Sequence, residues 1–272
     1  MNAVLCPLED AVAGIAGGAR LAIPPDYSGV AMAATRALLR RGTRGLRLVC
    51  CPTAGLQADL LIGAGAVAEI ETAAVSLGEW GPAPRFTAAV ERGAIAIRDA
   101  TCPAIHAGLQ AAEKGVPFMT VRGIIGSDLL AHRDDWRVIE NPFAAGDPIV
   151  VVPAIAPDVA LFHAALADAQ GNVWVGRRRE LVTMAHAAAR SVVTVEALYD
   201  GDLLADERLA AGSLPGLYVH AVALAPSGAW PLAFADLYRA DEAHLAAYAR
   251  DARDDAGFAR YLARHLAEPR AA

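Results

Sequence analysis

The sequence lacks a long uninterrupted apolar run, although hydrophobic residues make up 55% of its 272 residues. The best candidate for a membrane span, residues 149–167, contains two prolines as well as Asp158 and His163. A spanning helix needs about 20 consecutive, predominantly apolar residues. The first ten residues carry no basic region and already include two acidic side chains, which is atypical of a secretion signal. We therefore expect a cytoplasmic protein that makes no contact with a membrane.

Cysteine pairs and an excess of positive charge are also missing. The four cysteines form no Cys-x-x-Cys pair, and the adjacent Cys50 and Cys51 end an apolar run, so we interpret them as small buried hydrophobic residues and expect no metal site. A net charge of -6 argues against affinity for nucleic acid. The basic run 177–179 is interpreted as a solvated helix start. Because the chain is so apolar, we expect another protein chain to cover part of its surface.

Nucleotide-binding and hydrolase motifs are absent too. No Gly-x-Gly-x-x-Gly opens a helix, no Gly-x-x-x-x-Gly-Lys-Ser/Thr occurs, and the stretch from Gly63 to Gly65 follows an expected helix and not a strand. No Gly-x-Ser-x-Gly elbow supports a Ser/His/Asp hydrolase. The residues alone thus favour none of these common enzyme classes.

Short apolar runs that alternate with helical stretches dominate the first 130 residues. Repeated units of strand, loop and helix imply a parallel sheet with right-handed crossovers. From residue 236 onward the sequence is charged and carries an apolar stripe, which is typical of a covering helix. We predict an α/β fold, an open and mostly parallel sheet with helices on both faces. It would form one domain over residues 1–272, with residues 236–272 as a helical C-terminal cover. The expected strands are residues 20–23, 46–50, 70–76, 94–97, 116–121, 149–152, 159–163, 173–175, 191–196 and 217–224.

The stretch from Gly115 to Leu130 is the centre of this prediction. Residues 116–121 are short, apolar and follow a glycine, so we interpret them as a core strand of the parallel sheet. Ligands of open α/β sheets bind beyond the carboxyl ends of strands, where Arg122 would grip a carboxylate or phosphate. Two glycines there, Gly123 and Gly126, admit close approach of the backbone to an anion. Ser127 and Asp128 add a hydroxyl and a carboxylate, which either bind the ligand or cap a following helical turn.

Each earlier strand of the repeat is followed by its own polar residue. Ser28 is either a helix cap or an anion-binding group, and Thr53 follows the second strand. Glu79 lies between a glycine and a tryptophan, so it is either a pocket acid or an exposed loop residue, and Asp99 follows the fourth strand. We expect these residues and the 122–128 turn to converge on one rim of the sheet.

Three residues of the second half have simpler interpretations. His163 has no second ligand at metal spacing, so a hydrogen-bonded core histidine is favoured over a zinc ligand. Asp168 precedes a Gly-Asn turn signal and is expected to fix that turn. Glu196 ends a strand, and it has either a functional role or a place in a salt bridge.

Four stretches carry a resemblance to a known family. They are residues 59–67 (Asp-Leu-Leu-Ile-Gly-Ala-Gly-Ala-Val), 115–128, 141–143 (Asn-Pro-Phe) and 157–172. In order and spacing they resemble the alpha subunit of the family I coenzyme A transferases, which include glutaconate and 3-oxoacid CoA-transferases. The resemblance extends from about Gly18 to Leu224.

The resemblance implies an enzyme made of two kinds of chain. An alpha chain pairs with a similar beta subunit, usually as an α2β2 heterotetramer, and a glutamate of the beta subunit becomes a glutamyl-CoA thioester. This chain would then contribute substrate-binding groups and no catalytic residue, metal or permanently bound cofactor, with coenzyme A as co-substrate. The groups expected to bind the acyl-CoA and the carboxylic acid are Ser28, Thr53, Glu79, Arg122, Gly123, Gly126, Ser127 and Asp128.

Two departures from the family pattern keep other functions open. Residues 24–29 read Pro-Pro-Asp-Tyr-Ser-Gly where relatives carry a Gly-Gly-Phe turn, and residues 98–101 lack the glutamate that relatives often show. The first alternative is a subunit of a hydrolase that breaks a carbon-carbon bond in a cyclic CoA thioester, with Glu79 and Asp99 as acid and base. The second is a ligand-sensing module without enzymatic activity, although no DNA-binding segment accompanies it.

Overall fold

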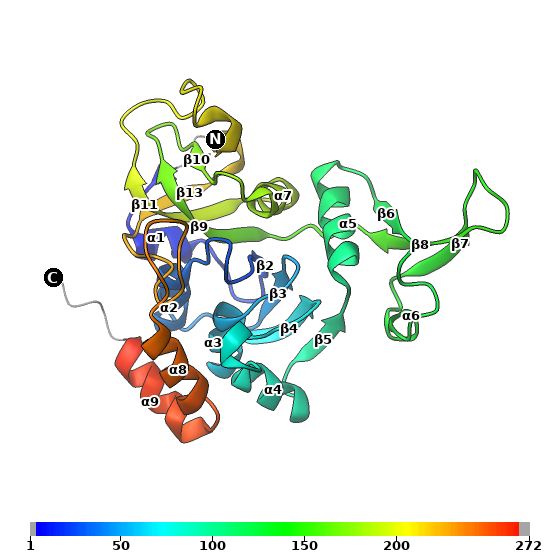
Figure 1. Ribbon diagram of the computed structural model, residues 1–272, viewed down its shortest axis with the longest axis horizontal. Helices are drawn as coiled ribbons and strands as arrows, with labels where there is room; N and C mark the ends of the chain where they lie inside the picture. Colours follow the sequence, from blue (N-terminus) through cyan, green and yellow to red (C-terminus); the bar gives the residue numbers. More distant parts are fainter. Residues whose placement is uncertain (1–3, 267–272) are drawn as a thin grey trace.

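A computed structural model describes residues 4–266, and its centre is an open sheet whose main strands are all parallel (Figure 1). Two further short strands extend this sheet in antiparallel fashion, β10 beside β9 and β12 beside β10. The predicted α/β class with a mostly parallel sheet is confirmed. In spatial order the main strands are β1 (Val4–Leu5), β13 (Ala221–Leu224), β11 (Ser191–Leu198), β9 (Val159–Ala167), β2 (Arg20–Ile23), β3 (Leu46–Cys50), β4 (Val67–Thr72) and β5 (Ala96–Asp99), and the added strands are β10 (Val173–Trp174) and β12 (Ser213–Leu214).

Helices cover both faces of this sheet, and the alternation of side chains along the strands explains why. In β2, Leu21 and Ile23 belong to one buried cluster, whereas Ala22 belongs to the cluster on the other face. A strand that is buried on both faces is apolar throughout, as these runs are. The helices packing on the first face are α1 (Leu8–Ala13), α2 (Met32–Arg40), α3 (Leu56–Gly63), α4 (Pro84–Glu91), α8 (Glu242–Asp251) and α9 (Asp255–His265), and those on the second are α5 (Cys102–Glu113) and α7 (Arg179–Ala187).

The stretch expected as a core strand lies elsewhere. Residues 118–121 form β6 (Phe118–Val121), which belongs to a separate antiparallel sheet with β8 (Pro148–Pro153) and β7 (Arg137–Glu140). This sheet and the short helix α6 (Leu129–His132) project beyond α5 at the far right of Figure 1, and we call residues 116–153 the arm. The prediction of a core strand was therefore wrong. Strand β5 already ends the parallel sheet, and a short apolar run is compatible with either sheet.

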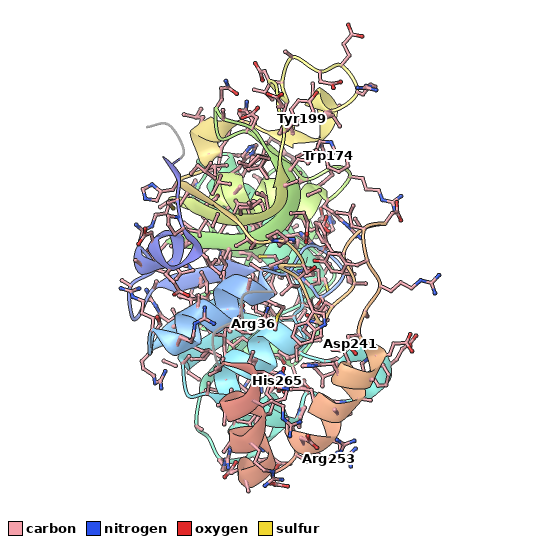
Figure 2. All side chains as sticks on the ribbon, turned by 90° about the vertical axis from the view of Figure 1, so that its left-hand side faces the viewer. Arg36, Trp174, Tyr199, Asp241, Arg253 and His265 are labelled. Carbon is pink, nitrogen blue, oxygen red and sulfur yellow. The ribbon has the colours of Figure 1, made fainter. Side chains whose placement is uncertain are left out.

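The C-terminal helices pack against the helices that cover the first face of the sheet. Tyr248 on α8 is fully buried, and its hydroxyl donates a hydrogen bond of 2.7 Å to Asp59 Oδ2 on α3. Figure 2 shows Arg36 of α2 above His265 of α9, with Asp241 just before α8. The predicted cover thus corresponds to α8 and α9 as far as residue 266, and residues 267–272 lie outside the described part of the chain. The one-domain boundary remains a prediction.

No described helix is long and apolar enough to cross a membrane. Three short 3-10 helices complete the secondary structure of residues 4–266: η1 (Gly78–Trp80), η2 (Ala210–Gly212) and η3 (Gly216–Tyr218).

Candidate functional site

Two cavities meet at the carboxyl ends of the central parallel strands. The smaller cavity, of about 330 Å³, lies among the loops that follow β2, β3 and β4, with Leu245 and Tyr248 of α8 completing its wall. The larger cavity, of about 890 Å³, extends from the same β2 turn to β9, β10 and the start of α7. Asp26 and Tyr27 line both cavities, so the turn after β2 forms the boundary between them. This is the rim where ligands of open α/β sheets bind.

The smaller cavity is built around a tight approach of two loops. Asp26 accepts a hydrogen bond of 2.9 Å from the backbone amide of Leu56, the first residue of α3. Gly55 makes this possible, because a Cβ at that position would lie 2.2 Å from Asp26 Oδ2. The other oxygen, Oδ1, is buried and has no hydrogen-bond partner among the described residues, although Asp26 as a whole is only half-buried.

Asp26 and Asp59 are two carboxyl groups with little access to water. Burial raises the pKa of Asp26 to about 6, with Asp59 adding to the rise and the Leu56 amide opposing it. Burial likewise raises the pKa of Asp59 to about 6, although the hydrogen bonds from Tyr248 and Phe86 act to lower it. Removing water penalises a carboxylate, so both groups hold their protons more tightly than exposed aspartates do. Asp26 is therefore a proton-holding group in the cavity wall.

The larger cavity has a hydrogen-bonded histidine in its wall. His163 on β9 is fully buried, with Nδ1 2.8 Å from Thr194 Oγ1 and Nε2 2.6 Å from Glu196 Oε1. A neutral ring donates from Nε2 to the carboxylate and accepts from the threonine hydroxyl at Nδ1. The predicted core histidine is confirmed. Asp168 also fixes its turn as predicted, since its Oδ1 accepts from the amides of Gln170 and Asn172.

Glu196 connects this histidine to the loop at residues 227–238. Its carboxylate accepts hydrogen bonds of 2.7 Å from the Tyr238 hydroxyl and from the Ser227 amide. Burial alone would raise the pKa of Glu196, but the bonds from His163, Tyr238 and Ser227 outweigh it and lower the pKa to about 2. The carboxylate is therefore ionised and fully engaged, which makes it a structural anchor of the cavity wall.

Arginines line the outer part of the larger cavity. Arg177 and Arg178 precede α7, and the guanidinium of Arg178 lies 5.6 Å from the centre of the Tyr27 ring. This distance is within the range of a cation–π contact. The basic run is thus not merely a solvated helix start, because two of its members line a cavity.

The predicted site residues lie in several separate places. Thr53 lines the smaller cavity and Glu79, which is exposed, lines the larger one. Ser28 is fully buried and does not cap α2, whose N-cap is Ala31, and its hydroxyl instead bonds to Glu180. The predicted cap at Ser28 was wrong, because the N-cap of α2 lies three residues further along, at Ala31.

The other predicted residues lie away from both cavities. Arg122 is in the arm, where its guanidinium pairs with both carboxylate oxygens of Asp147, with Nη2 2.7 Å from Oδ2. The Ser127 hydroxyl oxygen accepts a hydrogen bond of 3.1 Å from the Leu129 amide. Asp128, at the N-cap of α6, makes no side-chain hydrogen bond that caps the helix. Gly123 and Gly126 also lie in the arm. Asp99 lies at the end of the edge strand β5. The expected convergence on a single rim therefore holds for Thr53 and Glu79 but not for the arm residues.

Asp26 was not among the predicted site residues. It stands in the 24–29 turn, whose departure from the family pattern was the available signal. Over residues 4–266 no group of three or more His, Cys, Asp or Glu side chains is arranged to hold a metal ion. The arrangement therefore offers an apolar chamber, a proton-holding carboxyl group and, further out, arginines.

Known proteins similar to this chain share one family. The profile of the coenzyme A transferase family matches residues 8–225. The chain is 32% identical to the A subunit of 3-oxoadipate CoA-transferase from Pseudomonas knackmussii, over 86% of this chain and 83% of that protein. It is 31% identical to the cholesterol ring-cleaving hydrolase IpdA subunit of Rhodococcus jostii, over 95% of this chain and 90% of that protein. The chain spans about half of a similar Archaeoglobus fulgidus protein (51%) and 66% of the A subunit of glutaconate CoA-transferase from Acidaminococcus fermentans.

Solved structures give the same picture. Glutaconate coenzyme A-transferase of Acidaminococcus fermentans superposes with a TM-score of 0.89 at 27% identity, covering 98% of this chain and 89% of that chain. A chain of the decarboxylase AibA/AibB superposes with a TM-score of 0.82 at 34% identity, covering 97% of this chain and 100% of that chain. The profile match over most of the chain and the similarity to the 3-oxoadipate CoA-transferase chain show that this protein belongs to the coenzyme A transferase family.

Proposed function

We propose that this chain is the alpha subunit of a heteromeric CoA-transferase that moves CoA between an acyl-CoA and a free carboxylic acid. The observation that carries the proposal is the similarity to the A subunit of 3-oxoadipate CoA-transferase over most of both chains. Two cavities at the carboxyl ends of the parallel strands support it, because they give an acyl substrate a place beside this chain. Coenzyme A would be a co-substrate and not a resident group.

The nucleophile is proposed to be a glutamate of a beta-type partner, which forms the glutamyl-CoA thioester in an α2β2 assembly. In this chain, Glu196 is held by His163, Tyr238 and Ser227 and is therefore unsuited to attack a thioester. Covalent catalysis divides the thioester exchange into two easier steps. This chain would contribute the walls of the acyl site, with Thr53 and Glu79 nearest to the ligand.

The arm is the surface that we assign to the partner in this proposal. Phe143 at its tip is 94% exposed, and Val138 and Phe118 are about half exposed. Exposed apolar side chains gathered on one element are typical of a protein interface. Arg122, Gly123, Gly126, Ser127 and Asp128 lie on the same arm, so any contact they make with substrate would be made at the boundary between the two chains.

A hydrolase of carbon-carbon bonds is the second candidate. The similarity to the IpdA subunit covers more of this chain than the similarity to the transferase subunits does. Asp26, whose pKa is raised to about 6, would suit acid-base chemistry better than Asp99, which lies on the edge strand.

A trapping experiment separates the first two candidates. The chain is purified with its beta-type partner and incubated with acyl-CoA alone, then treated with borohydride. A transferase accumulates glutamyl-CoA, so we expect inactivation and a reduced glutamate on the partner. Absence of the adduct, together with loss of activity on replacing Glu79 or Asp26, would favour the hydrolase.

A further inference from the structure

We infer that the smaller cavity binds the acyl group of the substrate and selects a compact apolar acyl group over one that carries a second carboxylate, with Asp26 as the specificity-determining residue. The inference deepens the proposed function and rests on it.

The lining of the cavity defines the kind of group that fits. Its apolar wall consists of Leu56, Leu77, Trp80, Leu232 and Leu245, and all four leucines are buried. A cavity of roughly 150 Å³ holds benzene, so about 330 Å³ accommodates a branched chain or a ring. Transfer of such a group from water to this wall is favourable by about 25 cal/mol for each Å² of apolar surface.

The charges around the cavity exclude a second carboxylate. Within the described residues 4–266, no Lys, Arg or His lines it, and Asp26 is its sole ionisable carboxyl group. A ligand carboxylate placed here would lose its water without gaining a cation, which is costly. The arginines of the site, Arg177 and Arg178, line the larger cavity on the other side of the Asp26–Tyr27 turn.

Asp26 also offers one specific polar contact. Its Oδ2 is engaged by the Leu56 amide, and its Oδ1 has no partner among the described residues. A protonated Asp26 would donate from Oδ1 to one acceptor oxygen of the ligand, such as a thioester carbonyl. Leaving that oxygen unpaired has a cost, so a ligand that satisfies it gains affinity.

The surroundings of Asp26 raise its pKa to about 6, so the carboxyl group is protonated below that pH and ionised above it. The ionisable groups that face it are Asp59 on α3, Cys50 at the end of β3 and, in the same cavity wall, Tyr248 on α8. Burial and Asp59 raise the pKa of Asp26, and Cys50 and Tyr248 are themselves held in their neutral forms by burial. The repulsion of a second carboxylate is therefore expected to strengthen as the pH rises past about 6.

The test compares hexanoate with adipate, two acceptor acids of equal length that differ by one carboxylate. With the assembled enzyme, we expect kcat/KM to favour hexanoate by about tenfold or more. Asp26→Asn removes the charge and should reduce that preference severalfold and abolish its rise above about pH 6. Asp10→Asn, an exposed matched change on α1, should leave the preference as it is. A wild-type preference for adipate, or an unchanged ratio in Asp26→Asn, would overturn the inference.

A second variant covers the case in which Asp26→Asn does not fold. Trp80→Ala enlarges the cavity, so we expect the preferred linear acid to become longer, from hexanoate towards octanoate. An unchanged chain-length preference would argue against the cavity as the acyl site.

Failure of the proposed function is distinguishable from failure of this inference. If the assembled protein transfers CoA to no acid, binding of hexanoyl-CoA and adipoyl-CoA is compared by calorimetry. A preference for hexanoyl-CoA that weakens in Asp26→Asn or shifts to longer chains in Trp80→Ala would support the cavity assignment without transfer. Equal binding of the two thioesters would refute it.

Discussion

Arg133 places its Nη2 2.8 Å from Oε1 of Glu71, and both side chains are only 3% exposed. Glu71 lies on β4 of the main sheet, whereas Arg133 follows α6 in the arm. Arg133 also donates to Asp135 and to the backbone oxygen of Asp99, and Arg20 holds the second oxygen of Glu71 at 2.7 Å. This buried network joins the base of the arm to the edge of the parallel sheet.

The first prediction concerns that network. Arg133→Met leaves Glu71 buried without its arm partner and should lower the free energy of unfolding by about 3–5 kcal/mol. Urea denaturation measures this, and limited proteolysis should show earlier cleavage within the arm. Arg208→Met removes an exposed ion pair with Asp206 and should lower the free energy of unfolding far less. Equal losses for the two variants would show that burial of the Glu71 pair has no special importance.

The second prediction concerns the pH dependence of stability. The pKa of Asp26 is raised to about 6 in the folded chain, so between about pH 4 and 6 the folded state binds more protons than the unfolded state. Its contribution is complete below the unfolded pKa and is lost as pH rises through the folded pKa. Two pKa units correspond to about 3 kcal/mol at most. Asp26→Asn should therefore be more stable, relative to wild type, at pH 8 than at pH 4.

Urea unfolding at the two pH values measures this difference, with Asp10→Asn as the exposed control. Asp59→Asn would remove the neighbouring charge but would also disturb the hydrogen bond from Tyr248, so it is the less suitable variant. A difference between Asp26→Asn and wild type that does not change with pH would contradict the raised pKa.

The third prediction concerns Glu196, whose pKa is lowered to about 2. A depressed carboxyl pKa stabilises the folded state above the unfolded value, near 4.5, and this stabilisation is lost as pH falls towards 2. Tyr238→Phe removes one of the bonds that lower the pKa and should cost about 1–2 kcal/mol at neutral pH. Thermal melts of Tyr238→Phe and of Tyr199→Phe, whose hydroxyl bonds Asp206 in an exposed loop, provide the comparison. A loss no larger than that of Tyr199→Phe would mean that the Glu196 anchor matters little.

Two strands could be predicted from the sequence to the residue. Strands β2 and β3 match because each is an apolar run bounded by glycine or proline, and because both faces of the sheet are buried. The strand Phe118–Val121 was assigned to the wrong sheet because it has the composition of a core strand. Its partner strand β8 lies about 30 residues further along the chain. No local pattern specifies which sheet such a strand joins.

The candidate site was predicted less completely than the fold. Thr53 and Glu79 were found because they follow parallel strands, and that rule is topological. Asp26 follows β2 just as closely, but the significance of its carboxyl group depends on the Leu56 amide and on Asp59. Those partners are about 30 residues away in the chain and become neighbours only through folding.

The fourth prediction tests whether Arg122 handles substrate. Arg122→Ala should reduce CoA transfer by the assembled enzyme more than Arg122→Lys does, because lysine keeps the charge but loses the two-point contact. Asp147→Asn frees the guanidinium from its present partner and serves as the companion variant. Rates that fall equally in Asp147→Asn and Arg122→Ala would identify the pair as a support of the arm and not as a ligand site.

The last prediction concerns Gly55, whose missing side chain lets Asp26 approach α3. A Cβ at this position would lie 2.2 Å from Asp26 Oδ2 and 2.7 Å from the Ser76 backbone oxygen, so one of the two loops must move. Gly55→Ala should cost about 1–3 kcal/mol of stability, a range typical of overpacking. It should also weaken the hydrogen bond from Leu56 and change the cavity, so the preference for hexanoate over adipate should shrink in the assembled enzyme. Gly14→Ala, where a Cβ would meet only the end of Arg190 at 3.7 Å, is the matched control and should be neutral. If Gly55→Ala matched this control in both stability and acid preference, the close approach of Asp26 to α3 would have no role in the site.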